Sequence, residues 1–312
     1  MKVQAPTVNQ PAARWSDQLN QYYRLTKPRV VALIMFTAIV GMFLAVPGMV
    51  PLPDLMLGTL GIGLAAASGA AINHLLDIDL DAKMARTQNR PLPTGNLNRT
   101  QAFIFAIGLA LVSMVILVTW VNMLTAILTF FSLVGYAVIY TVFLKHATPQ
   151  NIVIGGASGA MPPVLGWAAV TGHVSSDALL LFLIIFCWTP PHFWALALYR
   201  HKEYANAGVP MLPVTHGAKF TRLHILLYTI LLTAVSIMPF ATHMSGWMYL
   251  VGALILNAGF LYYAVRLYVD YSDALSKKTF AYSIQYLAML FGLMLIDHYS
   301  GPAVELLRRL IP

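Results

Sequence analysis

The chain is dominated by long apolar stretches that alternate with short polar connections. Nine stretches approach the span of about 17 to 25 residues that a transmembrane helix needs. Their apolar positions run on without the polar face that a helix at the surface of a soluble domain would show. The pattern therefore predicts an all-α polytopic membrane protein with about nine transmembrane helices, centred on residues 30–45, 55–76, 102–119, 124–144, 152–170, 178–199, 223–241, 248–267 and 280–296.

Composition supports this prediction and excludes several other classes of protein. Of the 312 residues, 59% are hydrophobic and 10% charged, whereas about 25% of residues are charged in a soluble domain. The single cysteine, Cys187, cannot form an intrachain disulfide or a thiolate metal site. Disulfide-rich secreted scaffolds and zinc modules are therefore excluded.

The basic residues predict the orientation of the helices. The net charge of +8 could suggest nucleic acid, but 17 of the 19 Lys and Arg residues fall in the N-terminal segment and in every second connection. This asymmetry is typical of cytoplasmic loops, so we expect a cytoplasmic N-terminus, an odd number of spans and no nucleic-acid partner. We divide the chain into a cytoplasmic tail (1–29), one transmembrane domain (30–299) and a C-terminal tail (300–312). The first 29 residues lack the apolar core of a signal peptide, so we expect the first span to be retained.

An acidic motif follows the second predicted span. Asn73, Asp77 and Asp81 are four residues apart, so a helix continuing through them would place their oxygens on one face. Like charges at this spacing repel each other, unless a divalent cation lies between them. Mg²⁺ prefers oxygen ligands and is commonly held by one or two carboxylates together with substrate phosphates. Asp79 and His74 point to other faces and are weaker candidates.

Basic residues close to this motif are candidates for binding phosphate. Lys83, Arg86 and Arg90 follow the carboxylates, and Lys145 precedes the fifth span. Carboxylates, a metal ion and guanidinium groups together describe a diphosphate site. The alternative is a solvated loop whose acids and bases pair with each other. The regular spacing at the membrane edge favours the diphosphate site.

The fifth and sixth spans carry further candidates. His192 follows Pro190 and Pro191, which we expect to kink the helix. An ionisable side chain within a span usually faces the bundle interior or a polar cavity. Pro162 and Pro163 predict a similar break in the fifth span, where Asn151 either caps the helix or contacts substrate.

Four stretches carry a family resemblance: Leu25 to Arg29 (LTKPR), the motif from Asn73 to Leu92, NIVIGGASGAMPPVLGW from Asn151, and Pro191-His192-Phe193-Trp194 running to Pro213. They resemble the UbiA superfamily of intramembrane prenyltransferases, in the form seen in the protohaem IX farnesyltransferases. The resemblance implies a UbiA-type helical bundle in a bacterial cytoplasmic (inner) membrane. It also implies farnesyl transfer from farnesyl diphosphate to a vinyl group of haem b, with addition of water, giving haem O. Haem b is then a substrate, and Mg²⁺ is the cofactor. The implied partners are membrane lipid, haem-processing proteins and terminal oxidase assembly proteins.

The resemblance also implies roles for single residues. Many UbiA-type enzymes have a second aspartate pair after the sixth span, where this chain has only Glu203, and the haem O synthases usually have Asp at that position. The implied sets are catalytic Asp77, Asp81, His192 and Glu203; metal-binding Asn73, Asp77 and Asp81; diphosphate-binding Lys83, Arg86, Arg90, Lys145, Arg200 and Lys202; and substrate-binding His192, Trp194, Tyr199, Tyr204 and Asn151. Arg200 and Lys202 could instead contact the haem propionates.

Two alternatives stay open on the sequence. A UbiA-type prenyltransferase acting on an aromatic or quinone precursor would share the first motif but would be expected to have the second aspartate pair. A transporter would also have broken helices, but its ionisable groups would lie nearer the bilayer midplane.

Overall fold

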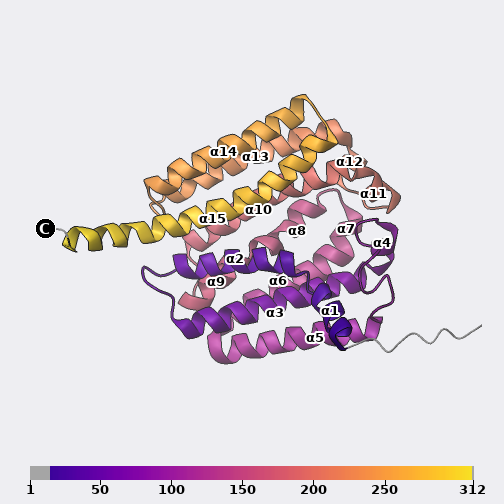
Figure 1. The fold of residues 1–312 in the computed structure, drawn as a ribbon, viewed down its shortest axis with the longest axis horizontal. Helices are drawn as coiled ribbons and strands as arrows, with labels where there is room; N and C mark the ends of the chain where they lie inside the picture. Colours follow the sequence, from indigo (N-terminus) through magenta and orange to yellow (C-terminus); the bar gives the residue numbers. More distant parts are fainter. Residues whose placement is uncertain (1–14, 311–312) are drawn as a thin grey trace, which may run out of the picture.

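The structure, a computed structural model, describes residues 15–310, all of whose regular elements are helical (Figure 1). This confirms the predicted all-α class. The elements are α1 (Trp15–Leu25), α2 (Pro28–Leu44), α3 (Leu52–Leu76), α4 (Ile78–Lys83), α5 (Arg99–Ile116), η1 (Leu117–Val121), α6 (Met123–Val134), η2 (Gly135–Leu144), α7 (Lys145–Ala147), α8 (Asn151–Ala160), α9 (Pro162–Thr171), α10 (Ser176–Tyr199), α11 (His201–Asn206), α12 (Leu212–Thr215), α13 (Gly217–Ala241), α14 (Trp247–Val269) and α15 (Asp273–Leu310).

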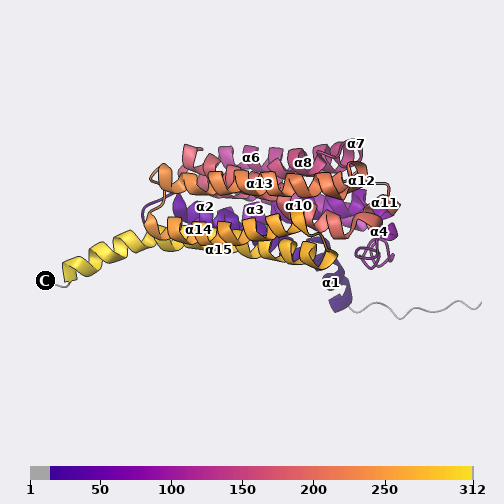
Figure 2. The same cartoon turned by 90° about the horizontal axis from the view of Figure 1, so that it is seen from above.

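The long helices lie side by side in one bundle (Figures 1 and 2). Within the described residues, eight helical stretches are long and apolar enough to cross a membrane, and α1 with α2, bent by 53°, makes a ninth. The short helices α4, α7, α11 and α12 gather at one end of the bundle together with α1 (Figure 1). The basic connections therefore share one end, which we call the polar-loop end.

The two predicted tails are partly helical. Residues 15–25 form α1, whose pattern of Trp15, Leu19 and Tyr22 is too short and too polar to count as an apolar stretch. Residues 1–14 lie outside the described part of the chain. At the other end, α15 continues past residue 300 to Leu310, and residues 311–312 are again outside the description.

Breaks in the spans differ in part from those predicted. Met161 separates α8 from α9 before Pro162, as expected. Pro190 and Pro191 lie inside α10, where the kink stays a prediction. The third and fourth spans end in the π-helical segments η1 and η2. A π segment leaves no mark in an apolar stretch, and such segments are frequent at functional sites.

At the end opposite the polar loops, Asp297 of α15 stabilises the start of α14. Its carboxylate accepts hydrogen bonds from the backbone N–H groups of Gly246 and Tyr249. Such N-terminal groups have no partner inside their own helix. Asp297 therefore has a structural role.

Glycine allows α2 and α9 to touch. A Cβ at Gly166 would overlap the carbonyl oxygen of Ala38, and one at Gly41 would overlap the backbone of Pro163. Small residues permit such close approach of membrane helices.

We expect Gly166→Ala to destabilise the protein by about 1–3 kcal/mol, because the added methyl group must push two backbones apart. Thermal unfolding in detergent measures this loss. Gly159→Ala is the matched control, since no atom lies within 4 Å of its Cβ position. A melting temperature for Gly166→Ala equal to that of the control would contradict the packing argument.

Candidate active site

The acidic motif lies where α3 ends and α4 begins, at the polar-loop end. Asp77 is the junction residue, yet helical spacing continues across it: the Asp77 N–H bonds to the Asn73 carbonyl (3.0 Å) and the Asp81 N–H to the Asp77 carbonyl (2.7 Å). The Asn73 Nδ2 also donates to Asp77 Oδ2 (2.8 Å). The three side chains are only 3–5% exposed.

Three basic side chains meet this motif, and two of them, Lys27 and Lys145, come from distant parts of the chain. Lys145 Nζ lies 2.6 Å from Asp77 Oδ2, and Arg90 Nη1 donates to both carboxylate oxygens of Asp81, at 2.9 and 2.7 Å. Lys27, in the break between α1 and α2, donates to Asn73 Oδ1. Buried charges are costly unless they are paired, so the cations explain how the carboxylates are tolerated here.

The donor set of this cluster suits Mg²⁺. It offers two carboxylates and an amide oxygen, the hard ligands that Mg²⁺ takes, and Asp77 Oδ1 has no hydrogen-bond partner among the described residues. Within residues 15–310, no three His, Cys, Asp or Glu side chains form a metal cluster. The remaining ligands would therefore have to come from substrate phosphate and water.

Of the six predicted phosphate-binding residues, three form ion pairs and three do not, within the described residues. Arg90 and Lys145 lie in the acidic cluster, and Arg200 pairs with Glu203 (2.8 Å). Lys83, Arg86 and Lys202 are exposed and form no ion pair within the described residues. His74, the weaker candidate, is buried with neither ring nitrogen hydrogen-bonded in the described structure.

Apolar packing connects the acidic motif with the predicted site residues at the end of α10 and in α11. Met84, just after α4, belongs to the same buried cluster as Trp194, Leu198 and Tyr204. Burial raises the pKa of Tyr204, although the nearby charges of Arg86 and Arg200 lower it. The Tyr204 hydroxyl therefore stays neutral and can donate a hydrogen bond.

His192 lies in α10 within an aromatic stack. Its ring stacks on Trp188 (centroids 4.2 Å apart) and Phe280 (4.6 Å). Its Nδ1 is 2.7 Å from the Ser283 Oγ, whose own proton is donated to the Phe280 carbonyl (2.7 Å). Ser283 must then accept from His192, which assigns the proton to Nδ1 and leaves the Nε2 lone pair available.

Two further predicted substrate contacts, Trp194 and Asn151, are buried. Trp194 is fully buried against His224 and Tyr228 of α13. Asn151 is also buried, and its Nδ2 donates to the Lys145 carbonyl (3.3 Å), which fixes the turn that presents Lys145 to Asp77. The assignment of these residues to substrate stays a prediction.

Sequence reasoning missed three residues. Lys27 lies in the LTKPR stretch that carries the resemblance, but no site role was predicted for it, although its place directly before Pro28 at the membrane edge was a usable signal. Thr141 is 3.4 Å from the Asn73 Nδ2 because η2 turns it inward, and its hydroxyl donates to the Tyr136 carbonyl (2.9 Å). Neither this contact nor that of Ser283 leaves a mark in the apolar pattern.

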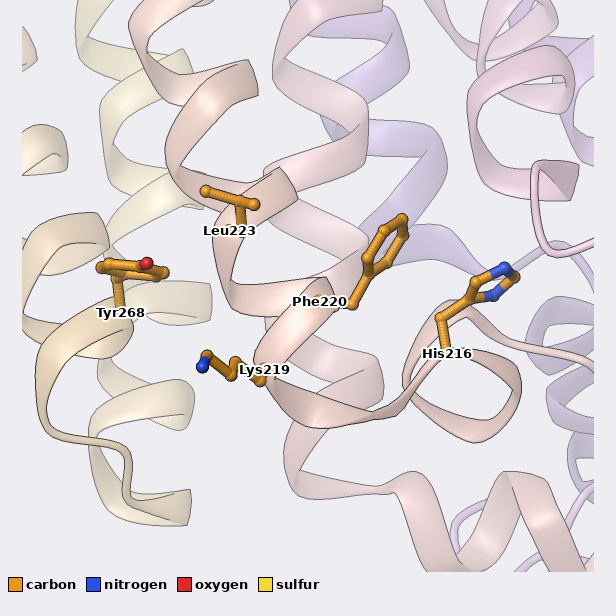
Figure 3. Close-up of a pocket in the computed structure, with 5 residues that line it drawn as sticks. All are labelled: His216, Lys219, Phe220, Leu223 and Tyr268. Atoms are coloured by element: carbon orange, nitrogen blue, oxygen red, sulfur yellow. The ribbon is translucent and has the colours of Figure 1, made fainter.

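Two surface hollows lie elsewhere. One, of about 330 Å³, is lined by His216, Lys219, Phe220, Leu223 and Tyr268 at the polar-loop ends of α13 and α14 (Figure 3). The other, of about 520 Å³, lies over α2 and α3 and is lined by Ile39, Leu55, Met56, Leu57, Thr59 and Leu60. Neither includes a predicted site residue.

Sequence comparison finds close relatives over nearly the whole chain. Residues 34–291 match the model of the UbiA prenyltransferase family. A protein named protoheme IX farnesyltransferase from Nitrosospira multiformis is 62% identical over 284 residues, covering 91% of this chain and 95% of the relative. A protein of the same name from Saccharophagus degradans is 58% identical, covering 97% and 98%.

Solved structures share the fold at low sequence identity. A digeranylgeranylglyceryl phosphate synthase aligns with a TM-score of 0.76 at 18% identity, covering 90% of this chain and 98% of that one. A UbiA homologue from Archaeoglobus fulgidus, bound to DMAPP and Mg²⁺, aligns with a TM-score of 0.65 at 17% identity, covering 88% and 99%. The bundle is therefore of UbiA type.

Proposed function

The chain belongs to the UbiA prenyltransferase family, and from this premise we propose that it is a protohaem IX farnesyltransferase. It transfers the farnesyl group of farnesyl diphosphate to a vinyl group of haem b, and water adds to give haem O. The observation that carries the proposal is the buried Asn73–Asp77–Asp81 cluster with its three cations, in a chain about 60% identical to relatives of that name.

The two alternatives are less well supported. Membership of a prenyltransferase family excludes the transporter. An enzyme acting on an aromatic or quinone precursor would share the family, but the relatives named above are farnesyltransferases of protohaem, and the second acidic site here is reduced to Glu203, which is paired with Arg200.

We assign Asn73, Asp77 and Asp81 to Mg²⁺, which when bound would neutralise diphosphate and favour departure of the leaving group. Lys145 and Arg90 already touch the carboxylates, so they can turn to phosphate oxygens when substrate arrives. Lys27 lies beside them, and the exposed Lys83 and Arg86 can close over the outer phosphate. Cations placed where negative charge develops lower the barrier to C–O cleavage.

His192 supplies a base for the second half of the reaction. The vinyl group attacks the farnesyl carbon, which forms the new C–C bond and leaves a cation on the porphyrin side chain. Water adds to this cation and must lose a proton. Nε2 of His192 can accept it, because the Ser283 contact keeps the other ring nitrogen protonated.

The membrane fixes the orientation of substrate. The protein is integral to the membrane, and we assign it to the bacterial inner membrane with the polar-loop end cytoplasmic, because the basic loops gather there. Diphosphate then stays at the cytoplasmic surface while the farnesyl chain lies among the helices. We expect haem O to pass to haem-processing or terminal oxidase assembly proteins.

The direct test supplies farnesyl diphosphate, haem b and Mg²⁺ to the purified protein in nanodiscs and follows haem O by mass spectrometry. We expect haem O to form and EDTA to suppress it, with excess Mg²⁺ restoring it. Wild-type protein that is folded but yields no haem O would overturn the proposal.

A further inference from the structure

We propose that Arg200 and Lys277, on the ring of Tyr199, bind the two propionate carboxylates of haem. This rests on the proposed function and goes beyond it, because Lys277 belongs to none of the residue sets considered above. The inference gives the two anionic substrates separate places: diphosphate at the Asp77 cluster and propionates at the end of α10.

Arg200 and Lys277 lie beside the same aromatic ring, that of Tyr199. The Arg200 Cζ is 5.4 Å from the centroid of the Tyr199 ring, and the Lys277 Nζ is 5.5 Å from the same centroid. One residue comes from the end of α10 and the other from the first turns of α15. The Tyr199 ring therefore has a cation from each of two helices beside it.

Hydrogen bonds hold α15 in this position. Ser276, next to Lys277, donates to the Ala195 carbonyl (2.8 Å). Deeper in the membrane, the Trp188 Nε1 donates to the Ser283 carbonyl (2.8 Å). The start of α15 is therefore fixed in register against α10, and Lys277 with it.

Local charge is left over at this place. Glu203 accepts from Arg200 at 2.8 Å, but Lys277 has no ion pair among the described residues. Arg200 also keeps a buried Nε without a hydrogen-bond partner in the described structure.

Aromatic side chains lead from the two cations into the bundle, where Trp188 and His192 are buried. Aromatic rings continue from Tyr199 to Phe280 (centroids 6.5 Å apart), then to His192 and Trp188. His192 lies seven residues from Tyr199, or about 10 Å along the helix. Haem carries its two carboxylates on one edge of an apolar plane, so its charged edge matches Arg200 and Lys277 and its apolar part matches the neighbouring aromatic side chains.

The test measures binding without the prenyl donor, so that it is independent of turnover. Wild-type protein in nanodiscs is titrated with haem b and with its dimethyl ester, which lacks both charges, and the Soret absorbance is followed. We expect wild type to bind the diacid more tightly than the ester. Lys277→Gln should weaken binding of the diacid by about tenfold, as loss of one charged contact would, and should leave the ester unchanged.

Lys278→Gln is the matched control, because Lys278 is the neighbouring exposed lysine, and it should behave as wild type. Unchanged KM for farnesyl diphosphate in Lys277→Gln shows that the variant is folded. Diacid affinity equal to wild type in this variant, with haem O still formed, would overturn the propionate site and leave the proposed function standing. Absence of both haem binding and haem O from wild type would instead overturn the function.

Discussion

Asp77→Asn is expected to lower turnover by at least about 10²–10³-fold, the loss typical when a group that stabilises transition-state charge is removed. The substitution keeps the size of the side chain but removes the charge that would hold Mg²⁺. It also leaves Lys145 buried without its carboxylate partner, which lies 2.6 Å away in the wild type. Haem O formation at saturating substrate measures the effect.

Instability must be separated from lost chemistry, because a buried charge that loses its partner costs about 3–5 kcal/mol. The double variant Asp77→Asn/Lys145→Met removes the stranded cation and should recover thermal stability but not activity. Asp79→Asn is the matched control: this carboxylate is two residues away, and its side chain is 91% exposed. Wild-type activity in Asp77→Asn would refute the assignment of this residue.

The sequence predicted the local geometry of the acidic motif but not its distant partners. The spacing of Asn73, Asp77 and Asp81 indicated one face, and helical hydrogen bonds do continue across the junction at Asp77. Local periodicity is enough for this, since the residues belong to adjacent turns. The partners Lys27 and Lys145 are 46 and 68 residues away from the motif, and no local pattern fixes such tertiary contacts.

In the fold, too, the sequence predicted some elements and missed others. Apolar length predicted the spans, because the requirement to satisfy backbone groups in lipid leaves helices as the natural solution. The same pattern could not reveal η2, whose turns bring Thr141 to Asn73, since π and α segments have the same composition here. It also missed α1, since a short helix with exposed Trp15 and Leu19 needs no long apolar stretch.

His192 illustrates both outcomes in one residue. Its place within a span predicted a functional role, and that role stays a prediction. The hydrogen bond to Ser283, 91 residues away, came only from the structure. That contact makes the expected role specific, because it leaves Nε2 as the ring nitrogen that can accept a proton.

His192→Ala is therefore expected to lower kcat by about 10²–10⁴-fold, the contribution typical of a general base, while haem still binds. The propionate contacts at Arg200 and Lys277 and the aromatic rings of Tyr199 and Phe280 remain in this variant. Turnover and Soret titration are measured on the same preparation. Loss of haem binding in parallel with turnover would reassign His192 from base to haem anchor.

Two further variants separate a base from a packing residue. Ser283→Ala leaves the imidazole in place but frees its tautomer, so kcat should fall less than in His192→Ala, with KM for haem unchanged. His201→Ala, which removes an exposed histidine near the end of the same helix, should retain wild-type activity. Added imidazole can enter the space left by His192→Ala and accept the proton from water, so it should restore part of the turnover. For a base, the rescued rate should rise with pH as the neutral fraction of imidazole rises, whereas a ring that only refills the stack between Trp188 and Phe280 would give no such pH dependence.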